Sequence, residues 1–151
     1  MRGLDGKVAI IPGGATKIGA AVVKAFRDAG TQVMVADINA EAGRALEGDG
    51  VAFCETDIRD DAQVAALVNE TRERFGRIDF LVNVACTYLD NGIDSTRAEW
   101  LEALDVNLVG SVMLMQAARA DLAANKGAIV NFGSISSRVA QTGRWLYPVS
   151  K

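Results

Sequence analysis

Tyr147 and Lys151 are the residues of this sequence whose types and spacing most directly indicate proton chemistry. On a helix, residues four positions apart lie on the same face. An ammonium group beside a phenol stabilises the tyrosinate, which lets the phenol exchange a proton with a substrate oxygen near neutral pH. A surface pair with the same spacing would satisfy this pattern equally well. Other functional residues must therefore decide between the two interpretations.

Histidine is absent from the 151 residues. This excludes Ser-His-Asp and Cys-His nucleophiles and most zinc sites, so we expect no metal centre. An acid or base in this protein has to be Tyr, Lys, Asp, Glu or Cys.

A glycine-rich stretch, Pro-Gly-Gly-Ala-Thr-Lys-Ile-Gly at residues 12–19, directly follows the first apolar run. Where a strand passes into a helix, glycines let backbone N–H groups approach a pyrophosphate, and the helix dipole favours its negative charge. The stretch predicts the pyrophosphate site of a dinucleotide. A tight turn without a ligand is the alternative.

Two acidic residues stand where the next strands are expected to end. Asp37 can accept hydrogen bonds from the adenosine ribose and repel a 2′-phosphate, which favours NAD over NADP. Its alternative role is to open the turn into Asn39. Asp57 can bind the adenine amino group while Ile58 packs on the ring, although a turn residue is nearly as good an interpretation.

Together these features resemble the short-chain dehydrogenase/reductase family. The family's Thr-Gly-x3-Gly-x-Gly motif is matched at Gly13 and Gly19, and its Asn-Asn-Ala-Gly segment resembles Asn-Val-Ala-Cys at residues 83–86. The resemblance implies that Tyr147 is the general acid/base, that Ser134 holds the substrate oxygen and that Asn107 anchors a water in the proton path. It implies a catalytic set of Asn107, Ser134, Tyr147 and Lys151, and a cofactor site of Gly13, Lys17, Ile18, Gly19, Asp37, Asp57, Ile58, Asn83, Ala85, Tyr147 and Lys151.

Four residues depart from the family pattern, and all four lie near the expected cofactor: Pro12, Lys17, Val84 and Cys86. Lys17 replaces the middle glycine, so its side chain either crowds the diphosphate or brings an ammonium group to a phosphate oxygen. We favour the contact. We expect Cys86 to be a small packing residue rather than a reactive thiol.

The elements that position these residues follow from short apolar runs. Runs rich in β-branched residues predict buried parallel strands at residues 8–11, 33–36, 51–53, 80–82 and 128–132. Helical periodicity predicts helices over residues 18–29, with Ile18, Val22 and Phe26 on the inner face, and over residues 40–46, 61–75 and 96–123. The alternation predicts one α/β domain over residues 1–151. We expect a Rossmann-type, doubly wound parallel sheet in three layers, with helices on both faces.

Composition excludes several other classes. The 16 basic and 19 acidic residues are mixed along the chain, which argues against a nucleic-acid partner. The longest apolar runs fall well below the roughly 18 residues of a membrane span, so we expect no membrane partner. Without a visible secretory leader we expect a cytoplasmic protein in which Cys54 and Cys86 are reduced.

The resemblance implies an NAD-dependent oxidoreductase that interconverts a small secondary alcohol and a ketone. It also implies a homodimer or homotetramer, formed through the apolar helix of residues 96–123. Family members have roughly 250 residues, so about a hundred are expected to be missing from this chain. A nucleotide-sugar epimerase or dehydratase of the extended branch would need Gly in place of Thr16. A non-catalytic nucleotide-binding module, or an inactive truncated form, is the remaining alternative.

Overall fold

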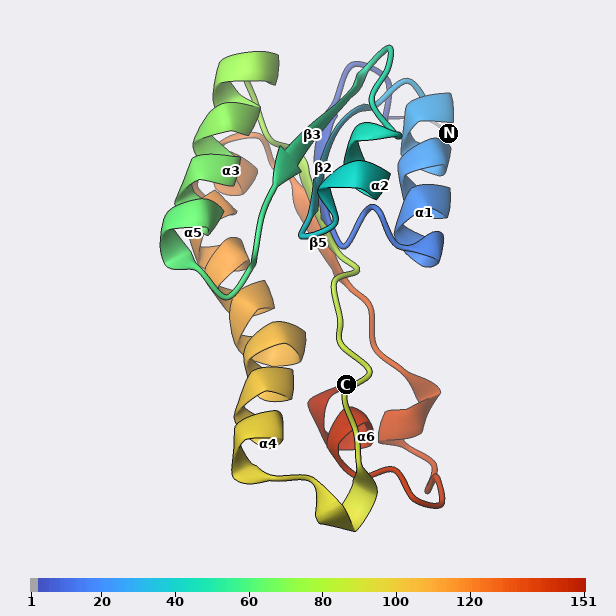
Figure 1. Cartoon of the computed structure of the whole chain (residues 1–151). Coiled ribbons are helices and arrows are strands. Elements are labelled where there is room, and N and C mark those ends of the chain that lie inside the picture. The colour runs from blue at the N-terminus through green and yellow to red at the C-terminus, as the bar shows by residue number, and fades with distance from the viewer. Residues whose placement is uncertain (1–2) are drawn as a thin grey trace.

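Five parallel strands form one sheet in the computed structural model, which describes residues 3–151 (Figure 1). The strand order is β3-β2-β1-β4-β5. The strands are β1 (Val8–Pro12), β2 (Gln32–Asp37), β3 (Val51–Glu55), β4 (Phe80–Asn83) and β5 (Ala128–Asn131). The chain moves outward from β1 through β2 to β3, then returns to the other side of β1 for β4. Ligands of such sheets bind at this point of reversal, beyond the carboxyl ends of the strands.

Helices cover both faces of the sheet, which confirms the predicted three-layer α/β fold. Helices α1 (Lys17–Asp28) and α2 (Ala40–Arg44) lie on one face, and α3 (Asp61–Phe75) and α5 (Gly110–Ala124) lie on the other (Figure 1). Two clusters of buried residues fill the two interfaces, one containing Ile10, Leu67 and Leu114 and the other containing Ile11 and Val23. Adjacent residues of β1 therefore serve opposite cores, which explains its continuous apolar sequence.

The first helix differs from the prediction at its start. Val22 and Phe26 pack against the core as expected, but Ile18 is 53% exposed and does not belong to the inner face. Ile18 lies in the first turn of α1 and lines a cavity there. Helix α2 is also two residues shorter than its predicted range of 40–46.

One long helical stretch follows β4. It consists of α4 (Arg97–Leu104), a π-helical turn at Asp105–Val109 and α5. The predicted capping box is present, because Thr96 and Glu99 satisfy each other's backbone N–H groups. By length and composition alone this stretch is apolar enough to cross a membrane. In this fold Leu114, Ala118 and Leu122 of the stretch lie in the core of the domain.

Strand β5 was predicted to be buried on both faces, and this prediction is wrong. All four of its residues are exposed, and Val130 is 49% exposed. The strand forms an edge of the sheet, and within residues 3–151 no further strand pairs with its outer side.

Beyond the carboxyl ends of the strands lies a group of loops and short helices, outside the three layers of the fold. It contains α4, the loops that follow β4 and β5, and the short helix α6 (Leu146–Ser150), which carries Tyr147 (Figure 1). Cys54 and Cys86 are both free thiols.

Candidate active site

The glycine loop after β1 packs against the segment that follows β4. Gly13 has a φ of +74°, and a Cβ added there would lie 2.5 Å from the Cα of Ala85. A Cβ at Gly19 would lie 2.1 Å from the carbonyl oxygen of Gly13. Any side chain at these two positions would therefore displace the backbone. Pro12 closes the same junction, because its carbonyl accepts the backbone N–H groups of Val84 and Ala85 at 3.1 and 2.9 Å.

Thr16 holds this loop, although the sequence did not predict it as a site residue. Its hydroxyl donates to the carbonyl of Gly13 at 2.7 Å and accepts the backbone N–H of Gly19 at 3.0 Å. It is the N-cap residue of α1. A threonine just before the first residue of a helix was the signal that would have identified it.

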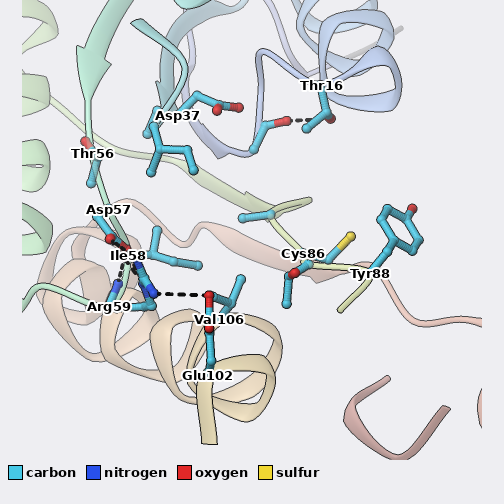
Figure 2. Close-up of a pocket in the computed structure, with 15 residues that line it drawn as sticks. Thr16, Asp37, Thr56, Asp57, Ile58, Arg59, Cys86, Tyr88, Glu102 and Val106 are labelled. Atoms are coloured by element: carbon cyan, nitrogen blue, oxygen red, sulfur yellow. Dashed lines mark hydrogen bonds and ion pairs between the residues drawn. The ribbon is translucent and has the colours of Figure 1, made fainter. Parts of the chain in front are cut away.

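Asp37 stands at the end of β2 and is only 9% exposed. One carboxylate oxygen accepts the backbone N–H of Ala15 at 3.0 Å, and the other accepts that of Asn39 at 3.0 Å. The turn role is therefore real, and each oxygen keeps a free acceptor position. Asp37 lines a cavity of about 360 Å³ together with Gly13, Ile58 and Ala85 (Figure 2).

Asp57 lines the same cavity but has a partner within the chain. Arg59 binds both of its carboxylate oxygens, at distances between 2.6 and 3.1 Å (Figure 2). These hydrogen bonds hold the pKa of Asp57 below its usual range, against a smaller effect of burial that raises it. An adenine amino group would have to share this carboxylate with Arg59. Ile58 is buried beside it and forms part of the cavity wall.

Asn83 ends β4 with an incomplete set of hydrogen bonds. Its amide nitrogen donates to Asn131 at 2.7 Å, while its buried Oδ1 has no hydrogen-bond partner among residues 3–151. Asn83 lines a second cavity, of about 250 Å³, together with Asn107 and Lys151. A residue that lines the second cavity thus has a buried polar atom without a protein partner.

Tyr147 and Lys151 lie together, as their spacing predicted. Both line a third cavity, of about 330 Å³, which Lys17, Ile18 and Cys86 also line. Ser134 and Tyr147 border a fourth, more open space. Tyr147 is thus shared by the third cavity and the open space beside Ser134.

Asn107 lies in the π-helical turn and connects two segments. Its amide oxygen accepts the backbone N–H of Thr87 at 2.7 Å, and its amide nitrogen donates to the Thr87 carbonyl at 3.1 Å and to the Ser150 hydroxyl at 2.8 Å. The side chain therefore fixes α6 against the loop after β4. The water-anchoring role that the resemblance implies stays a prediction.

Tyr88 is a further site residue that had no signal in the sequence. Its ring stacks on that of Tyr147, with centroids 4.9 Å apart and planes inclined by 25°. The neighbouring Cys86 thiol raises the pKa of Tyr88 to about 12. Cys86 and Tyr88 lie at one end of the cavity that Asp37 lines, and Asp57 and Arg59 lie at the other (Figure 2).

Lys17 occupies the exposed first turn of α1. It lines the cavity of Tyr147 and Lys151 rather than the larger cavity of Asp37. Whether its side chain crowds or contacts a diphosphate stays a prediction. Among residues 3–151, no three acidic or cysteine side chains are grouped as a metal site would require.

A family model described as enoyl-(acyl carrier protein) reductase matches residues 13–151, which is most of the chain. The chain belongs to the short-chain dehydrogenase/reductase family. Curated relatives of this short-chain dehydrogenase/reductase include an L-fucose dehydrogenase of Mus musculus, 35% identical over 97% of the chain and 55% of the relative. A D-threitol dehydrogenase of Mycolicibacterium smegmatis is 37% identical over 98% of the chain and 60% of the relative.

A solved structure has a similar fold. The crystal structure of gox2181 superposes with a TM-score of 0.89 at 32% identity, over 97% of the chain and 62% of that structure. The chain therefore spans a little more than half the length of the relatives that it matches.

Short-chain dehydrogenases/reductases use nicotinamide dinucleotides, and the residues present here fit such a group. The close approaches at Gly13 and Gly19 keep side chains out of the loop that would face the diphosphate. The carboxylate of Asp37 and the apolar side chain of Ile58 both line the cavity of about 360 Å³ that begins at this loop. The cavity thus offers a polar contact for a ribose and an apolar one for an adenine ring.

Proposed function

We propose that the protein containing these residues is an NAD-dependent oxidoreductase that interconverts a secondary alcohol and a ketone. The observation that carries this proposal is the position of Tyr147. It borders both the third cavity, with Lys151, and the more open space beside Ser134. A phenol in this position can reach a substrate oxygen that is held beside the cofactor.

Each residue of the set has a distinct role in this proposal. Tyr147 exchanges a proton with the substrate oxygen, and Lys151 stabilises the phenolate form. Ser134 holds the substrate oxygen, and Asn107 fixes α6 so that Tyr147 keeps its place. The bound nicotinamide dinucleotide supplies or accepts the hydride.

We further propose that the substrate is a small polyol or sugar. Relatives carry the names L-fucose dehydrogenase, D-threitol dehydrogenase and, for a 38% identical protein of Cereibacter sphaeroides, sorbitol dehydrogenase. The open space beside Ser134 is lined largely by hydrogen-bonding side chains: Tyr88, Ser134, Ser136, Gln141, Thr142, Arg144 and Tyr147. Such a lining suits a ligand with several hydroxyl groups, because each buried hydroxyl needs a partner.

The test is an assay of the longest protein that the gene encodes, with NAD and NADP, on polyols, sugars and apolar secondary alcohols. We expect turnover of polyhydroxylated substrates, and a loss of at least about a hundredfold in kcat for Tyr147→Phe. Binding of NAD by Tyr147→Phe, measured by calorimetry, should stay within about twofold of the unmodified protein. Full activity of Tyr147→Phe contradicts the proposed mechanism, and nucleotide binding without turnover of any substrate indicates a non-catalytic module.

A further inference from the structure

Asp90, in the loop between β4 and α4, is bonded to the segment that carries Tyr147. Its Oδ1 accepts the backbone N–H of Trp145 at 3.1 Å, and its Oδ2 accepts that of Tyr147 at 2.9 Å. Oδ1 also accepts the backbone N–H of Gly92 at 2.9 Å, within the loop itself. The contacts to Trp145 and Tyr147 cross 55 and 57 positions of sequence. One carboxylate therefore joins two distant segments of the chain.

These N–H groups need an acceptor from outside their own helix. The first backbone N–H groups of a helix have no partner within it. Trp145 is the N-cap residue of α6, and its side chain makes no capping hydrogen bond. Asp90 takes the place of that missing cap. Burial raises the pKa of its carboxyl, but the N–H groups of Tyr147, Trp145 and Gly92 lower it by more, so the group stays ionised as an acceptor.

The same loop touches the Tyr147 segment at two further points. Gly92 has a φ of +60°, and a Cβ there would lie 2.6 Å from the carbonyl oxygen of Gly143. Tyr88 stacks its ring on the ring of Tyr147. The loop thus contacts Tyr147 at both its backbone and its ring. In the described part of the chain, Asp90 is the one side chain that accepts the N–H of Tyr147.

We propose that Asp90 is a positioning residue, which fixes the backbone of Tyr147 so that its phenol stands beside Lys151 and Ser134. The catalytic consequence rests on the proposed function. The hydrogen bonds themselves do not, because they connect groups within this chain. A displacement of about 1 Å at a catalytic group costs roughly a hundredfold in rate, so loss of these bonds is expected to lower kcat far more than nucleotide affinity.

The experiment compares Asp90→Asn and Asp90→Ala with Asp94→Asn in the longest protein that the gene encodes. Asp94 is an exposed carboxylate of the same loop and serves as the matched control. Asp90→Asn keeps the size of the side chain but places an N–H₂ group against one of the backbone donors. Gly92→Ala is a fourth variant, which disturbs the contact of the loop with Gly143 in the Tyr147 segment without changing charge.

The first measurement does not depend on turnover. Amide hydrogen exchange of Tyr147 is followed with selectively labelled tyrosine, and the signal is assigned by its loss in Tyr147→Phe. We expect the amide to exchange at least about tenfold faster in both Asp90 variants and in Gly92→Ala, and to be unchanged in Asp94→Asn. Unchanged exchange in folded Asp90→Asn and Asp90→Ala overturns the proposal.

The second measurement separates positioning from general stability. We expect kcat to fall between about tenfold and a hundredfold in the Asp90 variants, while the dissociation constant for NAD stays within about twofold. Faster amide exchange with an unchanged kcat overturns the positioning role. If the unmodified protein turns over no substrate, the proposed function fails, and amide exchange still decides whether Asp90 holds Tyr147.

Discussion

Asp37 is the residue on which we expect the choice of cofactor to depend. Hydrogen bonds from Ala15 and Asn39 fix its carboxylate, so the charge cannot rotate away from an approaching 2′-phosphate. We expect the longest protein that the gene encodes to prefer NAD. Asp37→Ala should lower kcat/KM for NAD by roughly 10- to 100-fold, because hydrogen bonds to a charged group are lost. The preference for NAD over NADP should become smaller as a result.

The measurement is kcat/KM with each dinucleotide, and Asp49→Ala, which changes an exposed turn carboxylate, is the control. Equal or better kinetics of the unmodified protein with NADP would contradict this prediction.

Tyr88 offers a second test at the same scale. The Cys86 thiol is the main cause of its raised pKa of about 12. Cys86→Ala should therefore lower the pKa of Tyr88 towards its ordinary value of about 10. The tyrosine ring signals, followed by NMR during an alkaline titration, measure this change. Cys54→Ala removes the other thiol and should leave the titration midpoint of Tyr88 unchanged. If Cys86→Ala also leaves this midpoint unchanged, the Cys86 thiol is not the cause of the raised pKa.

At the scale of elements, the long helical stretch has an apolar outer face. Its inner residues lie in the core, but Leu101, Leu108 and Val109 are exposed, and Leu108 is 52% exposed. Exposed apolar side chains grouped on one helix are characteristic of interfaces, and two equal helices can cover each other about a twofold axis. We therefore propose that the complete protein is a dimer or tetramer that pairs through this stretch.

Light scattering at micromolar concentration should return at least a dimer mass for the unmodified protein. Leu101→Glu combined with Val109→Glu should shift the mass towards the monomer, because the new carboxylates would face each other across the interface. Glu41→Lys, a charge reversal at an exposed residue of α2 on the other face of the sheet, is the control. A monomer mass for the unmodified protein would argue against pairing through this helix.

At the scale of the whole molecule, stability at low pH depends on Asp79. This carboxylate is 1% exposed and joins the start of β1 to the start of β4 through Lys7, Arg77 and the backbone N–H of Val8. Burial raises its pKa, but these hydrogen bonds lower it by more. Because the pKa is lower in the folded state, the stabilisation is complete above the unfolded pKa of about 4. It is lost as the pH falls through the folded pKa.

Asp79→Asn should lower the free energy of unfolding near neutral pH by about 1–3 kcal/mol. It should also reduce the loss of stability on acidification. Urea unfolding at neutral and acidic pH measures both effects, with Asp49→Asn as the control. An unchanged acid dependence in Asp79→Asn would assign acid sensitivity to other carboxyl groups.

A polypeptide that consists of residues 1–151 alone provides the last prediction. In it, β5 is exposed along its length, and α6 ends one residue before Lys151. A short helix with few residues after it frays readily. We expect such a polypeptide to bind nucleotide weakly and to lack turnover, because Tyr147 and Lys151 would lose their fixed positions. The test is to assay this polypeptide and the longest protein that the gene encodes side by side. Comparable turnover by both proteins would show that the active site has been assigned to the wrong residues.

The sequence by itself determined the parallel strands, their order along the chain and the helices between them. These features depend on local causes: the continuous apolar runs of buried strands, the capping box of Thr96 and Glu99, and the glycines after β1. Tyr147 and Lys151 line one cavity, which is consistent with their spacing of four positions.

Only the tertiary structure decided which distant groups meet. The exposure of Ile18 and the edge position of β5 depend on how the elements pack. Asp90 reaches Tyr147 across 57 positions because the loops after β4 and β5 both begin at the carboxyl ends of neighbouring parallel strands. Periodicity and motif spacing report only on neighbours along the chain. Contacts between residues distant in sequence form only when the elements pack together, and the residue types alone do not specify them.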